Sequence, residues 1–92
     1  MITATNYRYL SDADLKTTIT EQEQLTIVLA VADGNSLCFL TESSLKKLPS
    51  MIRNKVSIFK IDYEINRELV INYRIQNTPT LLFFQGGQLI DK

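Results

Sequence analysis

The sequence has no histidine and no tryptophan, and its one cysteine is Cys38. Without histidine, the chain cannot form a Ser-His-Asp triad or a Cys-His catalytic pair. A single cysteine excludes a disulfide within the chain and offers at most one thiolate ligand to a metal. We therefore expect no metal site, and no motif in the sequence implies a cofactor.

An excess of charge of either sign is also missing. Ten lysines and arginines balance ten aspartates and glutamates, so the net charge is +0. Without a broad field of one sign, the surface attracts neither the phosphates of a nucleic acid nor an anionic lipid surface. We expect no nucleic acid and no membrane among the partners.

No apolar run reaches the roughly 18 to 20 residues that a membrane-spanning helix needs. The start of the chain, Met1–Asn6, lacks a basic region followed by an apolar stretch. These absences predict a cytoplasmic location. A length of 92 residues, with 45% hydrophobic and 22% charged residues, predicts a single globular domain over residues 1–92.

Hydrophobic periodicity predicts an alternation of strands and helices. A strand is expected at Tyr7–Leu10, followed by a helix that Ser11 caps and that ends near Glu21. The run Leu25–Val31 is almost continuously apolar, which is typical of a strand buried on both faces in a parallel sheet. This run is the best candidate for the central strand.

The second half of the chain continues the pattern and gives an α/β fold. Its predicted order is strand, helix, strand, helix, strand, helix, strand, strand, with helices on both faces of a mixed sheet. A helix is expected at 36–48, with a stripe of Leu37, Leu40, Leu45 and Leu48, and a strand at 56–61, in which Ser57 and Lys60 alternate with apolar residues. A short helix follows, with Ile65, Leu69 and Tyr73 on one face. The last two strands are expected at 80–85 and 88–90, joined at Gly86-Gly87. Pro49 should end or kink the second helix.

Three of these features together resemble the thioredoxin family. A buried strand leads into a helix that bears Cys38, and Thr78-Pro79-Thr80 looks like the family's cis-proline loop at the matching offset. Gly86-Gly87 resembles the family's final hairpin. The resemblance covers Val28 to Ile90 without a gap, and it implies a thioredoxin-like fold.

The resemblance also implies that ordinary dithiol chemistry is lost. Where the family reads Trp-Cys-Gly-Pro-Cys, this chain reads Gly34-Asn35-Ser36-Leu37-Cys38, so the second cysteine alone is kept. The nucleophilic cysteine is replaced by Asn35, which cannot act as a thiolate. The buried acid that the family carries nine positions before the second cysteine is Leu29 here. Dithiol oxidoreductase activity is therefore not expected.

Two functions from different classes stay open at this point. The first is a protein-interaction or regulatory module, in which, as the family resemblance implies, the backbone of Thr78 pairs with an extended partner segment. Its binding surface would consist of Asn35, Ser36, Leu37, Thr78 and Pro79. The alternative is a redox protein in which Cys38 acts as a single thiol, by thiol-disulfide exchange or as a glutathione adduct. Against the alternative, a free cysteine on a helix that enters a core is commonly a small buried apolar residue.

The end of the sequence suggests where a partner could bind. Thioredoxins usually continue after the last strand into a helix, whereas this sequence stops at Asp91-Lys92, so we expect the fold to lack that helix. Leu82 and Phe84 should point to one face of their strand. Leu81 and Phe83 should point to the other, so both faces need cover. We expect a protein partner or a second copy of the chain on the uncovered face.

Overall fold

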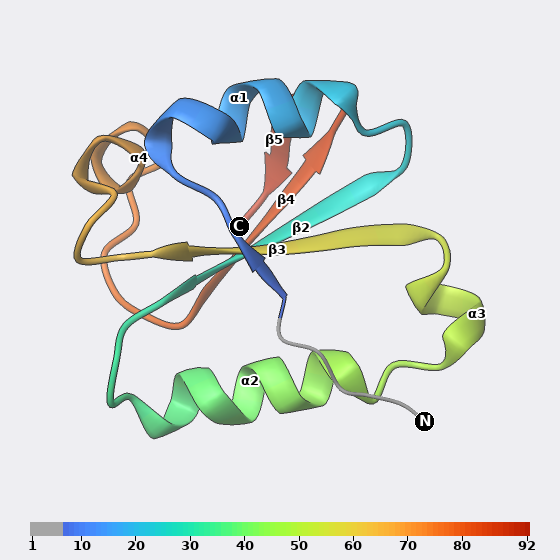
Figure 1. The fold of residues 1–92 in the computed structure, drawn as a ribbon, viewed down its shortest axis with the longest axis horizontal. Helices are drawn as coiled ribbons and strands as arrows, with labels where there is room; N and C mark the ends of the chain where they lie inside the picture. The colour runs from blue at the N-terminus through green and yellow to red at the C-terminus, as the bar shows by residue number, and fades with distance from the viewer. Residues whose placement is uncertain (1–6) are drawn as a thin grey trace.

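The structure of the protein, a computed structural model, describes residues 7–92. Strands and helices alternate along this part of the chain, as Figure 1 shows. The elements are β1 (Arg8–Tyr9), α1 (Asp12–Glu21), β2 (Leu25–Val31), α2 (Ser36–Lys46), α3 (Ser50–Arg53), β3 (Val56–Asp62), α4 (Arg67–Asn72), β4 (Thr80–Gln85) and β5 (Gln88–Asp91).

The strands form one mixed sheet in the order β1-β3-β2-β4-β5. β2 is the central strand: it runs parallel to β3 and antiparallel to β4. Every residue of β2 after Leu25 is buried, as its continuous apolar run predicts. β4 and β5 are antiparallel and joined at Gly86-Gly87, both of which have positive φ angles of the kind that favours glycine.

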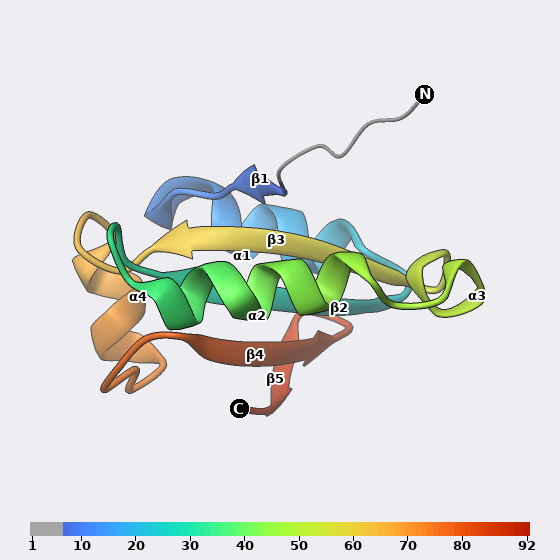
Figure 2. The same cartoon turned by 90° about the horizontal axis from the view of Figure 1, so that it is seen from below.

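Helices cover both faces of the sheet, which confirms the predicted architecture. Figure 1 shows the sheet between α1 and α2, and Figure 2 shows α2 lying along β2 and β3 from another side. The core on the side of α1 and α4 contains Leu10, Leu15, Ile19, Val28, Ala30, Ile61, Leu69, Ile75, Leu82 and Phe84. The core on the side of α2 contains Leu29, Val31, Cys38 and Leu45.

The first helix begins where the sequence predicts. The Ser11 side chain accepts a hydrogen bond from the Asp14 backbone N–H at 3.3 Å and donates one to the Asp14 carboxylate at 3.1 Å. α1 is also tied to α4, because the Asp12 carboxylate accepts from the Leu69 backbone N–H at 3.1 Å. In return, the side-chain oxygen of buried Asn66 accepts from the Asp12 backbone N–H at 3.0 Å. These bonds satisfy backbone donors at the starts of both helices.

The predicted helix at 36–48 begins at Ser36 and ends before Pro49, as predicted, but its predicted buried face is wrong. α2 ends at Lys46, and after Pro49 a separate turn of helix, α3, follows. Leu37 and Leu40 of the predicted stripe are exposed, and the inward face carries Cys38 and Leu45 instead. Apolar residues lie on both sides of this helix, so the leucine spacing alone does not define its buried face.

The predicted third helix begins too early. α4 starts at Arg67, and Ile65 lies in the preceding turn with 73% of its surface exposed. The cause is Asp62, whose carboxylate accepts from the backbone N–H groups of Glu64 and Ile65 at 2.9 and 3.3 Å. Such local side-chain bonds compete with helix formation, and they hold these residues in a turn.

The two faces of β4 differ as the alternation predicts. Leu82 and Phe84 are fully buried on the side of α1 and α4. Leu81 and Phe83 are half-buried on the other side, where Leu81 packs against the α2 core. Self-association or partner docking through this face stays a prediction. The structure contains no helix in residues 7–92 that is long and apolar enough to cross a membrane.

Candidate functional site

The predicted site residues lie where β2 ends and β4 begins. β2 and β4 pair in antiparallel register with Ala30 opposite Thr80. The loop that leads from β2 into α2 therefore lies beside the loop that precedes β4. The fold thus brings Asn35, Ser36 and Leu37 to the same end of the sheet as Thr78 and Pro79.

Asn35 fixes the start of α2. Its side-chain oxygen accepts hydrogen bonds from the backbone N–H groups of Leu37 at 2.9 Å and Cys38 at 3.3 Å. Asparagine is among the preferred residues at this capping position, because it satisfies donors that have no partner inside the helix. This capping role was not predicted from the sequence, although Asn35 directly precedes the first predicted helical residue.

The amide nitrogen of the same side chain reaches the second loop. Asn35 Nδ2 donates to the Thr78 carbonyl oxygen and to the Thr78 hydroxyl, both at 3.4 Å. The peptide bond between Thr78 and Pro79 is cis. One side chain therefore caps α2 and joins it to the proline loop.

The surface around this junction offers apolar and polar contacts. Leu37 is 60% exposed, and Ser36 beside it is exposed too. Thr78 and Pro79 are half-buried. Within residues 7–92, the Thr78 backbone N–H donates no hydrogen bond, so it is free to pair with another chain.

Cys38 points in the opposite direction, into the core. Its residue surface is 5% exposed, and its side chain packs in the α2 core with Leu29 and Leu45. No cluster of three metal-ligating side chains occurs among the residues that the structure describes.

A largely buried ion pair between Lys60 and Glu42 was not predicted. The Lys60 ammonium lies 3.3 Å from both oxygens of Glu42, and their side chains are 6% and 16% exposed. Lys60 also lies 4.3 Å above the centre of the Tyr9 ring, a favourable cation–π arrangement. Lys46 approaches the same carboxylate at 3.8 Å. The alternation at 56–61 treats Lys60 as a polar residue of the strand and does not predict that it is buried.

Sheet register explains why the pair forms. Lys60 lies directly opposite Leu29 on the neighbouring strand, so β2 supplies no counter-charge. Glu42 follows Cys38 by one helical turn on the inward face of α2 and supplies it instead. The spacing of Cys38 and Glu42 puts both on one face of the helix, but no sequence signal pairs Glu42 with Lys60.

The sequence model of the thioredoxin family matches residues 6–92. The chain is 27% identical over 82 residues to a thioredoxin of Synechocystis sp., which covers 89% of this chain and 77% of that protein. It is 29% identical over 55 residues to the bifunctional thioredoxin reductase/thioredoxin of Mycobacterium leprae, which covers 60% of this chain but 12% of that protein.

The solved structure of thioredoxin f2 from Chlamydomonas reinhardtii has the same fold. Its TM-score is 0.81 at 23% sequence identity, and the match covers 92% of this chain and 80% of that one. The sheet order, the helices on both faces and the proline loop beside α2 define a thioredoxin-like domain. With the family match over almost its whole length, the chain belongs to the thioredoxin family.

Proposed function

We propose that this thioredoxin-family domain is a protein-interaction or regulatory module without a dithiol active site. It binds an extended segment of a partner protein on the junction surface, which consists of Asn35, Ser36, Leu37, Thr78 and Pro79. We further propose a cytoplasmic location, in which an unpaired thiol is the ordinary state of cysteine.

The observation that carries this proposal is the double engagement of Asn35. The family resemblance assigns this position to the nucleophilic cysteine. Here its oxygen caps α2, and its nitrogen bonds Thr78. The position serves to hold two loops together, so the surface is retained while the reacting group is replaced.

The junction surface has the groups that an extended segment needs. The free Thr78 N–H can donate a hydrogen bond to a carbonyl oxygen of the partner, as in strand addition to a sheet edge. Exposed Leu37 offers an apolar contact beside it. A strand-like segment gains affinity from such main-chain bonds and specificity from its side chains.

Burial disfavours the single-thiol alternative. A reactive thiol is normally accessible and lies near a group that stabilises its thiolate or takes its proton. Cys38 is buried, and Leu29 lies beside it as an apolar neighbour. The carboxylate one helical turn away, Glu42, is paired with Lys60 and Lys46.

Selection from a library of random linear peptides without cysteine tests the proposal. Peptides that bind the wild-type protein are measured by titration calorimetry against Leu37→Asp and Cys38→Ser. Met51→Asp is the matched control, because Met51 is an exposed apolar residue of α3 at the far end of α2 from the junction surface (Figure 1).

We expect Leu37→Asp to weaken binding at least tenfold, and Cys38→Ser and Met51→Asp to leave it unchanged. A charge at the centre of an apolar contact removes the contact and adds a desolvation cost. Failure to select any peptide, or equal losses for Leu37→Asp and Met51→Asp, would contradict the proposal.

A further inference from the structure

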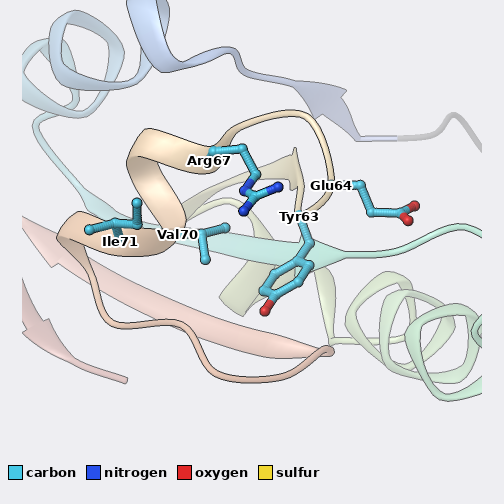
Figure 3. A pocket seen from close by; sticks show the side chains of 5 residues that line it. All are labelled: Tyr63, Glu64, Arg67, Val70 and Ile71. Atoms are coloured by element: carbon cyan, nitrogen blue, oxygen red, sulfur yellow. The ribbon is translucent and has the colours of Figure 1, made fainter.

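An open hollow of about 380 Å³ lies between the turn after β3 and α4. This volume is in the range of natural ligand pockets. Figure 3 shows the side chains that line it, which are Tyr63, Glu64, Arg67, Val70 and Ile71.

Two hydrogen-bond donors in this hollow have no partner within residues 7–92. Neither the Arg67 guanidinium nor the Tyr63 hydroxyl takes part in a hydrogen bond or an ion pair there. In Figure 3 the Arg67 side chain turns toward the space beside Val70 and Tyr63, whereas Glu64 extends away from it. A guanidinium and a phenol that line one hollow suit a carboxylate, which accepts hydrogen bonds from both.

Of the other lining residues, Val70 and Ile71 are apolar, and the Glu64 side chain extends away from the space between Arg67 and Tyr63 (Figure 3). Val70 is half-buried, and Ile71 is exposed on the outer side of α4. An aliphatic side chain placed against Ile71 would remove apolar surface of both partners from water. The lining therefore fits an acidic group with an aliphatic group next to it.

The hollow lies at the same end of the sheet as the junction surface. The Tyr63 backbone N–H donates to the Val31 carbonyl at 2.8 Å, and Val31 ends β2. On the other side of β2, Ala30 pairs with Thr80, next to Pro79. Since neighbouring strands are about 4.8 Å apart, the Tyr63 and Pro79 backbones are about 10 Å apart. About three residues of extended chain span that distance.

We infer that this hollow is a specificity pocket for an aspartate or glutamate side chain of the partner segment, with an aliphatic residue of that segment against Ile71. The inference rests on the proposed function, because the segment is the one bound at Thr78. The Arg67 guanidinium and the Tyr63 hydroxyl hold the carboxylate, and Val70 and Ile71 contact the aliphatic residue.

The test uses the peptides selected on the wild-type protein. In each peptide the acidic residue is replaced by its amide, and both forms are titrated against wild type, Arg67→Gln and Tyr63→Phe. Arg8→Gln is the control for loss of an exposed arginine, because Arg8 lies on the edge strand β1.

We expect the acid-to-amide change to lower affinity for the wild-type protein about tenfold, as for the loss of a charge-assisted hydrogen bond. The same change should have little effect on Arg67→Gln, because the partner charge is already gone. For Tyr63→Phe, the acid-to-amide change should lower affinity by a factor between those of wild type and Arg67→Gln. For Arg8→Gln, it should lower affinity as much as for wild type.

Three results would overturn the inference. Peptides that bind through Leu37 but show no preference for an acid would overturn it and leave the proposed function standing. Equal discrimination between acid and amide by wild type and Arg67→Gln would do the same. A library that yields no binding peptide would overturn the inference and the proposed function together.

Discussion

Asn35 Nδ2 lies 3.4 Å from both the carbonyl oxygen and the hydroxyl oxygen of Thr78, 43 residues further along the chain. The same side chain accepts from two backbone N–H groups of α2. One asparagine therefore sets the position of the helix start relative to the proline loop. The geometry of the proposed binding surface depends on this residue.

Substitutions at Asn35 separate its two roles. Asn35→Ala removes the cap and the bond to Thr78, and it should lower the free energy of unfolding by about 1 kcal/mol. Asn35→Asp keeps the oxygen acceptor at a helix start, where negative charge is favourable, and should lose much less. Urea denaturation measures both. Equal losses for the two variants would show that the cap contributes little.

The buried pair of Glu42 and Lys60 predicts a second stability effect. Glu42→Ala leaves the Lys60 ammonium buried without its counter-charge, and it should cost about 3 to 5 kcal/mol. The double variant Glu42→Leu with Lys60→Met removes both charges and should cost less than Glu42→Ala. Glu21→Ala, at an exposed carboxylate, is the control with an effect within about 0.5 kcal/mol. A double variant that is less stable than Glu42→Ala would contradict the role assigned to the pair.

Tyr7 predicts a loss of stability in alkali. Burial raises the pKa of Tyr7 above its ordinary value of 10.0, with a smaller contribution from the Glu42 carboxylate and an opposing one from Arg53. Above pH 10 the phenol then ionises in the unfolded chain before it ionises in the folded one. Stability should therefore be fully present below that pH and fall as pH rises through the folded pKa. The free energy of unfolding of Tyr7→Phe should fall less steeply with pH across this range, as measured by denaturation. The same dependence on pH in Tyr7→Phe and wild type would contradict the prediction.

Burial predicts slow labelling of Cys38 by a thiol-selective reagent. The side chain packs in the α2 core, so reaction requires local opening and should become fast when denaturant is added. The matched control is Ser36→Cys in a Cys38→Ser background, because Ser36 is exposed in the first turn of the same helix. Mass spectrometry follows both reactions. If native Cys38 labels as fast as the thiol introduced by Ser36→Cys, it is accessible, and the redox alternative is favoured.

Local sequence signals predicted most of the fold. The continuous apolar run at Leu25–Val31 identified the central strand, because a strand covered on both faces has no polar side. The capping pattern at Ser11 located the start of α1, since its bonds join residues three apart. The glycine pair at 86–87 predicted the hairpin, because glycine adopts positive φ without strain.

Features that depend on distant contacts were not predicted. Lys60 is buried because Glu42, 18 residues away, supplies its counter-charge, and strand alternation carries no information on that pairing. The bond from Asn35 to Thr78 forms when β2 and β4 pair. The hollow beside Arg67 depends on where α4 begins, and that start is set by the turn at Asp62. The candidate residues could be named from the sequence, but their contacts could not.

The proposed function holds that the domain does not catalyse thiol-disulfide exchange, and an insulin reduction assay tests this most directly. The wild-type protein and Cys38→Ser are compared with dithiothreitol as the reductant, and again with glutathione, which could replace the missing cysteine. We predict that neither protein accelerates reduction above the reductant alone in either condition. Acceleration by the wild-type protein that is lost in Cys38→Ser would contradict the proposed function and identify a single-thiol redox protein.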